Sequence, residues 1–184
     1  MSINPFIGYL RWRHSKGYGV HSPYAYRFVT DVVRPGDYGY YAYRKLDTLR
    51  HLSGRDESRV RFLIRLMVFL KTSEVVTEKE SYPASLAAIA AEALGVNYQS
   101  GISQNQEFNN TSLVIVAPDT TDTIGVRKAI ESGSAVLVFK PSAEIRDLLL
   151  DTRDNGLLIR GKNTQLFVPR KEMRFVAYDM RLSV

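Results

Sequence analysis

The side chains that most often carry catalysis or hold metals are few and far apart in this sequence. Cysteine is absent, which excludes disulfides and thiolate metal sites. The histidines, His14, His21 and His51, do not have the spacing of a metal site. His21 adjoins Ser22, but neighbouring residues rarely face each other, and serine before Pro23 is typical of a helix cap. No nucleophile elbow, Walker loop or dinucleotide fingerprint occurs, so we assign no catalytic residue and no metal ligand.

Positive charge and aromatic rings gather in the N-terminal part of the chain. Residues 1–71 contain 13 Lys or Arg against 5 Asp or Glu, a net charge of +8, whereas residues 72–184 carry −2. Of the 20 aromatic residues, 11 lie between Phe6 and Tyr43. Such a surface could bind nucleic acid by phosphate neutralisation and base stacking. The alternative, favoured by the lack of an RNP or GXXG signature, is that the rings pack on the domain and the charges are solvated.

A basic and aromatic group of residues is the best candidate for a surface that faces a ligand or partner. An arm docked on its own domain, or on a partner such as a second copy of the chain, would explain the same residues. A protein partner or homodimer and nucleic acid therefore both stay open. The candidate residues are Arg11, Trp12, Arg13, Lys16, Tyr18, His21 and Arg27.

Helical patterns dominate the part of the chain that would carry this surface. Gly17 and Gly19 interrupt the first helix, and the second ends before Pro35. The fourth has the clearest apolar stripe, and Gly54 is expected to terminate the third. The expected helices cover residues 3–15, 23–33, 40–52 and 57–71.

Strands and helices alternate after residue 72, which is typical of a parallel sheet covered on both faces. The last three strands follow one another without a helix, which implies antiparallel pairing at one sheet edge. A length of 184 residues fits one domain, with a helical part at 1–72 and a sheet-forming part at 73–184. The expected strands are 74–78, 96–99, 112–117, 135–139, 156–160, 165–169 and 174–182. The helices between them are 83–94, 122–131 and 143–152, with Ser81 as a cap and Gly95 as a terminator.

The bulk composition indicates a soluble globular protein. The hydrophobic share of 45% and charged share of 24% favour neither disorder nor a membrane protein. No apolar run approaches the roughly 20 residues that cross a bilayer. Arg11 and Arg13 follow the first apolar residues, on the wrong side for an export signal. We expect a cytoplasmic protein that binds no membrane.

Two sequence segments carry a resemblance to a known family. Residues 19–24 read GVHSPY, between a basic aromatic helix and YRFVTDVV, and the C-terminal region contains KEMRFVAYDMRL. With the strand order, these resemble a bacterial group of class I S-adenosylmethionine-dependent methyltransferases, most strongly at the N-terminus. The resemblance implies an α/β fold with a three-layer, doubly wound, Rossmann-like sheet, antiparallel C-terminal edge strands and an N-terminal helical extension. It also implies a cofactor over the carboxyl ends of the first two strands, at a topological switch point.

The turn after the first strand departs from the family's pattern. The family has a glycine-rich loop there, because the backbone must approach the cofactor without a Cβ between them. Here residues 75–90 read VVTEKESYPASLAAIA, without any glycine. Tyr82 and Pro83, with Lys79 and Glu80, would project into or beside the cleft, and proline also removes an amide. The resemblance places six residues in this vestigial cleft: Thr77, Glu78, Lys79, Glu80, Ser81 and Asp119.

The acid that should hold the cofactor ribose is also missing. Residues 97–106, NYQSGISQNQ, follow the second strand's start and contain no carboxylate. Asp119 lies where family members often place a functional acid, and its alternative is a turn or a helix cap. Residues 140–144, KPSAE, replace the acid-rich loop expected after the next strand.

These departures favour a methyltransferase-like protein that transfers no methyl group, binds no cofactor and serves as a binding or regulatory module. An active methyltransferase is the alternative, with S-adenosylmethionine in another pose and its positive group facing Glu78 or Glu80. Nucleic-acid binding by the N-terminal part is the third hypothesis. The crevice between the 74–78 and 112–117 strands, open or plugged, separates the first two.

Overall fold

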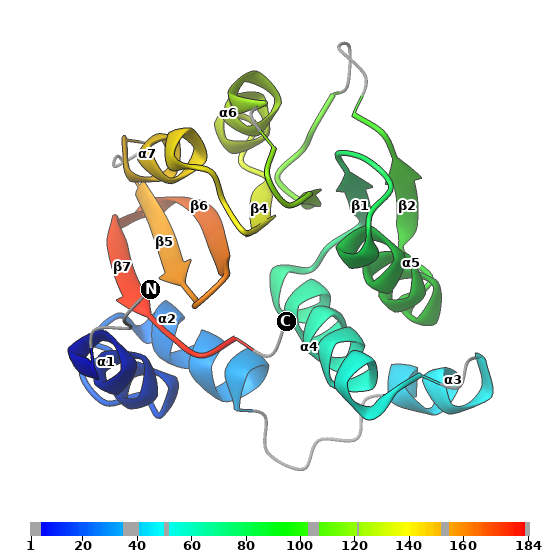
Figure 1. The fold of residues 1–184 in the computed structure, drawn as a ribbon, viewed down its shortest axis with the longest axis horizontal. Coiled ribbons are helices and arrows are strands. Elements are labelled where there is room, and N and C mark those ends of the chain that lie inside the picture. Colours follow the sequence, from blue (N-terminus) through cyan, green and yellow to red (C-terminus); the bar gives the residue numbers. More distant parts are fainter. Residues whose placement is uncertain are drawn as a thin grey trace.

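The computed structural model describes residues 5–34, 41–49, 52–102, 107–120, 122–151 and 155–182, and Figure 1 traces them. The helices are α1 (Pro5–Ser15), α2 (Pro23–Phe28) with its π-helical continuation η1 (Val29–Val33), α3 (Tyr41–Leu49), α4 (Gly54–Leu70), α5 (Tyr82–Leu94), α6 (Thr123–Glu131) and α7 (Ala143–Asp151). The strands are β1 (Glu74–Thr77), β2 (Asn97–Ser100), β3 (Ser112–Val116), β4 (Ala135–Phe139), β5 (Asn155–Arg160), β6 (Thr164–Arg174) and β7 (Val176–Asp179).

The strands form one seven-stranded sheet in the order β2-β1-β3-β4-β6-β5-β7. β2, β1, β3 and β4 pair in parallel, β6 is antiparallel to β4 and β5, and β7 is parallel to β5. The chain builds outward from β1 to β2 and then crosses over to β3 and β4, so the order reverses between β1 and β3. This reversal defines a doubly wound, Rossmann-like sheet and confirms the predicted fold class.

The C-terminal strands pair differently from a simple hairpin series. The antiparallel pairing expected there is present on both sides of β6. The last strand, β7, instead lies parallel to β5. Both edges of β6 are already hydrogen-bonded, so the final strand pairs with the free edge of β5 rather than with β6.

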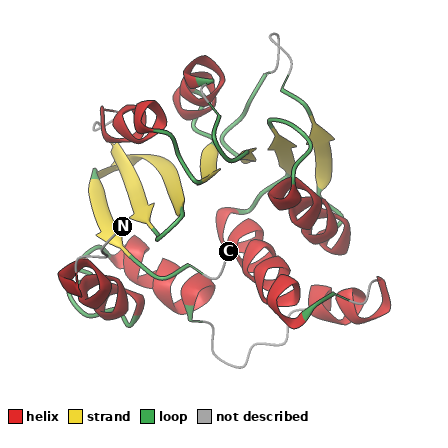
Figure 2. Ribbon diagram, viewed as in Figure 1, coloured by secondary structure: helices red, strands yellow, loops and turns green. Residues whose placement is uncertain are grey.

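Helices cover both faces of the sheet, as Figure 2 shows. The alternating side chains of β3 explain this arrangement, because successive residues of a strand point to opposite faces. Leu113 and Ile115 belong to a core shared with α2, α4 and α5, and Val114 and Val116 to a core shared with α6 and α7. All four are essentially inaccessible to solvent. The structure is therefore three-layered.

Serine caps set the starts of the helices that border the sheet's carboxyl edge. The Ser81 hydroxyl accepts a hydrogen bond from the Ala84 amide at 3.3 Å, and Gly95 ends α5, both as predicted. Ser53 caps α4 in the same way. The prediction that Gly54 terminates the third helix was wrong, because the Ser53 cap makes Gly54 the first residue of α4.

The close packing between β5 and β6 requires a glycine at position 156. Gly156 has φ +144°, and a Cβ there would lie 2.6 Å from the Val168 carbonyl oxygen. We expect Gly156→Ala to lower the free energy of unfolding by about 2 kcal/mol, measured by urea denaturation. Gly8→Ala is the control, because Gly8 lies within α1 with no atom within 4 Å of an added Cβ. That variant should gain up to about 1 kcal/mol, and equal losses in both variants would contradict this account.

Candidate functional site

The Glu78 side chain joins two strand ends at the switch point of the sheet. Open α/β sheets bind ligands beyond the carboxyl ends of their strands at such a point, which here lies between β1 and β3. Glu78 leaves β1, and its carboxylate accepts a hydrogen bond from the Ala117 amide at 3.1 Å and another from the Thr120 hydroxyl. Both donors lie in the segment that follows β3. The Glu78 carboxylate therefore joins the ends of β1 and β3, and both of its oxygens have protein donors.

The other residues predicted for the cleft are dispersed. Thr77 is fully buried, and its hydroxyl lies 3.2 Å from the Tyr98 hydroxyl. Lys79 and Glu80 are exposed, and Ser81 caps α5. Asp119 is exposed in a turn with φ +60°, and Asp122, rather than Asp119, caps α6. These six residues do not converge on one point.

A pocket of about 340 Å³ lies beside the switch point, toward β4. It is bounded by α4, the start of α5, the ends of β3 and β4, and the turn between β5 and β6. Of the residues predicted for the cleft it includes Ser81, and it also contains the two residues expected to obstruct the cofactor, Tyr82 and Pro83. Its walls are formed by Arg59, Leu63, Ser81, Tyr82, Pro83, Leu86, Pro118, Phe139, Lys140, Asn163 and Thr164.

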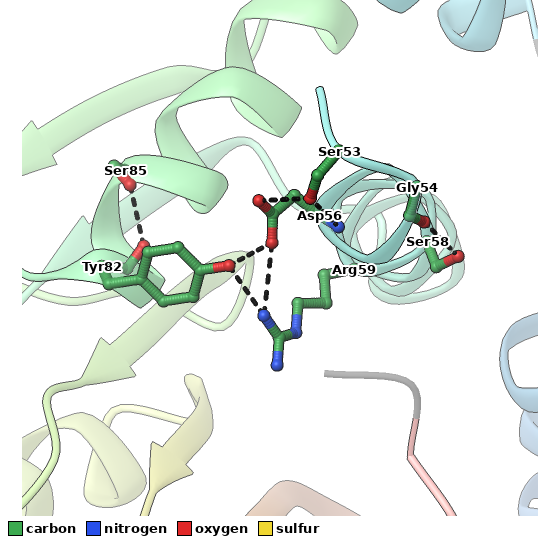
Figure 3. Close-up of polar contacts among 7 residues, drawn as sticks. All are labelled: Ser53, Gly54, Asp56, Ser58, Arg59, Tyr82 and Ser85. Atoms are coloured by element: carbon green, nitrogen blue, oxygen red, sulfur yellow. Dashed lines mark hydrogen bonds and ion pairs between the residues drawn. The ribbon is translucent and has the colours of Figure 1, made fainter. Parts of the chain in front are cut away.

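Tyr82 is held against α4 by a polar cluster (Figure 3). Its hydroxyl donates to Asp56 Oδ1, and Arg59 Nη1 donates to the same oxygen at 3.3 Å and to the Tyr82 hydroxyl at 2.7 Å. The Ser53 hydroxyl donates to the other Asp56 oxygen at 2.8 Å. The cluster joins α4 to α5 and fixes the orientation of two residues in the pocket wall.

Hydrogen bonding in this cluster moves two pKa values in opposite directions. The bond from Tyr82, followed by those from Ser53 and Arg59, holds the pKa of Asp56 below its ordinary value of 3.8. The same bond to Asp56 raises the pKa of the Tyr82 phenol above its ordinary value of 10.0. The pair is therefore a carboxylate and a neutral phenol at neutral pH.

Sequence reasoning missed four polar residues of the pocket: Arg59, Lys140, Asn163 and Thr164. Arg59 sits on the polar side of an amphipathic helix, a position that is usually solvated. Lys140 was noticed only as a departure from the family's acidic loop. Asn163 reaches the pocket through the β5–β6 turn, which approaches β4 because β6 inserts between β4 and β5.

The predicted N-terminal surface is divided between docking contacts and free side chains. Arg11 donates from Nη2 to the Gly161 carbonyl at 3.1 Å, and the His14 ring lies 3.0 Å from the Asp179 carbonyl. The Ser15 hydroxyl accepts from the Arg181 amide at 2.7 Å, and the His21 amide donates to the Tyr178 hydroxyl at 3.3 Å. These contacts dock α1 and the segment after it on β7 and on the ends of β5 and β7, as the docked-arm alternative requires.

An exposed row of rings and cations remains on the outer side of α1. Tyr9 and Trp12 stack with ring centroids 6.1 Å apart, and the Lys16 ammonium lies 4.4 Å from the Trp12 centroid. Arg13 lies 5.8 Å from the Tyr9 ring. Among the other predicted surface residues, Tyr18 is exposed and Arg27 pairs with Asp31 at 3.8 Å. We call Tyr9, Trp12, Arg13 and Lys16 the α1 row.

Metal clusters and membrane-spanning helices are both absent from the described part of the chain. No three His, Asp or Glu side chains there lie close enough together to hold a metal ion. Within the same ranges, no helix is both long enough and apolar enough to cross a membrane.

Comparisons with known proteins add little. No family model matches the chain, and no curated protein sequence does. One solved structure, a Listeria monocytogenes protein provisionally described as a class I S-adenosylmethionine-dependent methyltransferase, aligns over 95% of this chain and 84% of its own. Its identity is 8% and its TM-score 0.36. A likeness this weak carries no argument, so the fold class stands on the sheet order alone.

The Tyr82 cluster generates a prediction about pH. Tyr82→Phe should lower the free energy of unfolding at neutral pH, because the bond between α4 and α5 is lost. The stabilisation from Asp56 is full above its ordinary pKa of 3.8 and disappears as pH falls through the lower folded value. The stabilisation from Tyr82 is full below the ordinary phenol pKa of 10.0. It disappears as pH rises through the higher pKa that Tyr82 has in the folded protein. The difference from the wild type should therefore shrink at both extremes, as measured by urea denaturation across pH.

Tyr26→Phe is the matched control for this measurement. Tyr26 is 51% exposed against 53% for Tyr82, and its hydroxyl has no partner among the described residues. It should show no such pH-dependent difference. A difference in Tyr82→Phe that stays constant through the acid range would refute the assigned bond to Asp56.

Proposed function

We propose that this chain is a methyltransferase-like protein that transfers no methyl group and acts as a binding or regulatory module. The observation that carries the proposal is the Glu78 carboxylate. Both of its oxygens accept hydrogen bonds from the segment after β3, namely from Ala117 and Thr120. An acid held in this way is fixed toward the segment after β3, so a sulfonium or amino group could use only its remaining lone pairs.

The residues around Glu78 do not fit S-adenosylmethionine in the family's usual pose. The turn before α5 has no glycine, and Pro83 is buried at the start of that helix. The end of β2 offers no carboxylate for a ribose: the described residues 97–102 read NYQSGI. Each departure removes a different contact to the nucleoside, so a single compensating change would not restore the site.

Calorimetric titration with S-adenosylmethionine and S-adenosylhomocysteine tests the proposal. We expect no saturable heat at micromolar concentrations of either compound, because Glu78 is held by protein donors and the site lacks the ribose acid. Thermal unfolding of the same sample establishes that the protein is folded. A micromolar dissociation constant for either compound would count heavily against the proposal.

Glu78→Ala gives this test a structural counterpart. If the carboxylate serves to join the two loops, its loss should cost about 1–3 kcal/mol of unfolding free energy. Glu80→Ala, two residues away and exposed, should stay within about 0.5 kcal/mol of the wild type. Equal stability of the two variants would mean that Glu78 has no structural role.

Nucleic-acid binding is a second candidate, supported by the α1 row. Stacked rings beside cations are the usual means of holding single strands, where each stacked base contributes about 1–3 kcal/mol. Trp12 is 39% exposed, so part of the row is accessible to solvent. A protein partner or a second copy of the chain on the same surface stays a prediction.

Binding of fluorescent single-stranded oligo(dT), followed by anisotropy, tests this second candidate. We expect affinity that falls steeply with added salt, and a loss of roughly fivefold or more in Trp12→Ala and in Lys16→Gln. Arg127→Gln is the control, since Arg127 is an exposed cation on α6, across the sheet from α1. Equal losses in Lys16→Gln and Arg127→Gln would leave only bulk charge as the cause.

A further inference from the structure

The pocket beside the switch point has a cationic rim. Its lining residues include Arg59 and Lys140 and no Asp or Glu. The nearby carboxylate of Asp56 partly compensates Arg59, because the two pair at 3.3 Å. Lys140 has no ion pair or side-chain hydrogen bond among the described residues. The charged side chains that line the pocket are thus both cationic, which favours an anion.

Hydrogen-bond donors on this rim are left without protein partners. The Asp56 and Tyr82 contacts of Arg59 both use Nη1, so Nε and Nη2 are unpaired within the described ranges. The Asn163 side-chain amide likewise has no described partner. The bonds at Nη1 hold the Arg59 guanidinium in place, and its Nε and Nη2 donors are left for a ligand. This arrangement is preorganised to bind a carboxylate or phosphate.

The backbone holds Lys140 in an unusual conformation at the pocket. Its φ is +44°, in the left-handed region that lysine seldom adopts. Its amide donates to the Asn163 carbonyl at 2.7 Å, so the end of β4 is anchored to the β5–β6 turn. Backbone strain of this kind concentrates at ligand sites. This hydrogen bond places the Lys140 ammonium and the Asn163 side-chain amide on adjoining parts of the pocket wall.

The interior of the pocket is apolar. Leu63 and Leu86 are buried, and Pro83, Pro118 and Phe139 complete a hydrophobic surface beneath the cations. The volume of about 340 Å³ lies near the lower end of the roughly 300–1,000 Å³ common for small-molecule sites. A ligand with a flat apolar body and one anionic group would use both the floor and the rim.

We propose that this pocket binds a small aromatic carboxylate or phosphate, with its ring over Leu63 and Leu86 and its anionic group between Arg59 and Lys140. The inference rests on the proposed function, because it assigns a class of ligand to the proposed non-catalytic binding module. Tyr82 has a positioning role, because it orients Arg59 through their 2.7 Å hydrogen bond.

Titrations followed by ¹H–¹⁵N correlation NMR test the proposal with four probes. Benzoate and phenyl phosphate carry both a ring and an anion, benzamide lacks the charge, and inorganic phosphate lacks the ring. We expect saturable shifts at the amides of Tyr82, Lys140 and Asn163 with an aromatic anion. Binding of benzamide and inorganic phosphate should be at least about tenfold weaker, equivalent to about 1.4 kcal/mol. The tighter of the two aromatic anions identifies carboxylate or phosphate as the preferred group.

Charge-removing variants locate the binding. Arg59→Gln and Lys140→Gln should each weaken the aromatic anion about tenfold, and Lys162→Gln should leave its affinity unchanged. Lys162 is an exposed lysine next to Asn163 that does not line the pocket, so it matches Lys140 in charge and neighbourhood. If Arg59→Gln fails to fold, Lys140→Gln carries the test alone, since the Lys140 side chain makes no described contact.

Three results would overturn the inference: no saturable shift with either aromatic anion, equal affinity for benzamide, or unchanged affinity in Lys140→Gln. None of these bears on whether S-adenosylmethionine binds. Conversely, cofactor binding by calorimetry would defeat the proposed function while leaving aromatic-anion binding at Arg59 and Lys140 to be judged separately.

Discussion

A carboxylate that joins two loops is the interaction on which the architecture of this site depends. Glu78 receives hydrogen bonds from Ala117 and Thr120, and thereby ties the end of β1 to the end of β3 at the point where the sheet order reverses. Charged hydrogen bonds of this kind are roughly twice as strong as neutral ones. The pocket next to these contacts is lined by residues that follow β1, β3 and β4.

The wall of the pocket depends on how α4 and α5 are joined. Tyr82 lies at the start of α5, and its ring leans on α4 through Asp56 and Arg59. The same contacts fix the positions of two residues that line the pocket, Tyr82 and Arg59. The segment after β1 therefore supplies both a link between two helices and part of the pocket wall.

The N-terminal helices contribute to both the core and the surface. Phe28 and Val32 are fully buried against the sheet, which explains part of the aromatic enrichment without any ligand. Arg11 and His14 are committed to backbone carbonyls near β7, whereas the α1 row faces outward. Composition alone does not distinguish the docked residues from the exposed ones, because burial depends on which side of α1 each residue occupies once the helix docks.

Local signals in the sequence determined the helices and strands, because each acts within a few residues. They are the apolar stripe of α4, the Ser81 cap, the Gly95 terminator and the alternation of β3 and β4 with helices. They were sufficient for the fold class and for the missing glycines after β1. The tertiary structure alone decided that Glu78 reaches Ala117, that Arg59 and Lys140 border one pocket although 81 positions separate them in the sequence, and that β7 pairs with β5. Those contacts join residues distant in the chain, and their geometry follows from strand order and helix packing, which local preference does not encode.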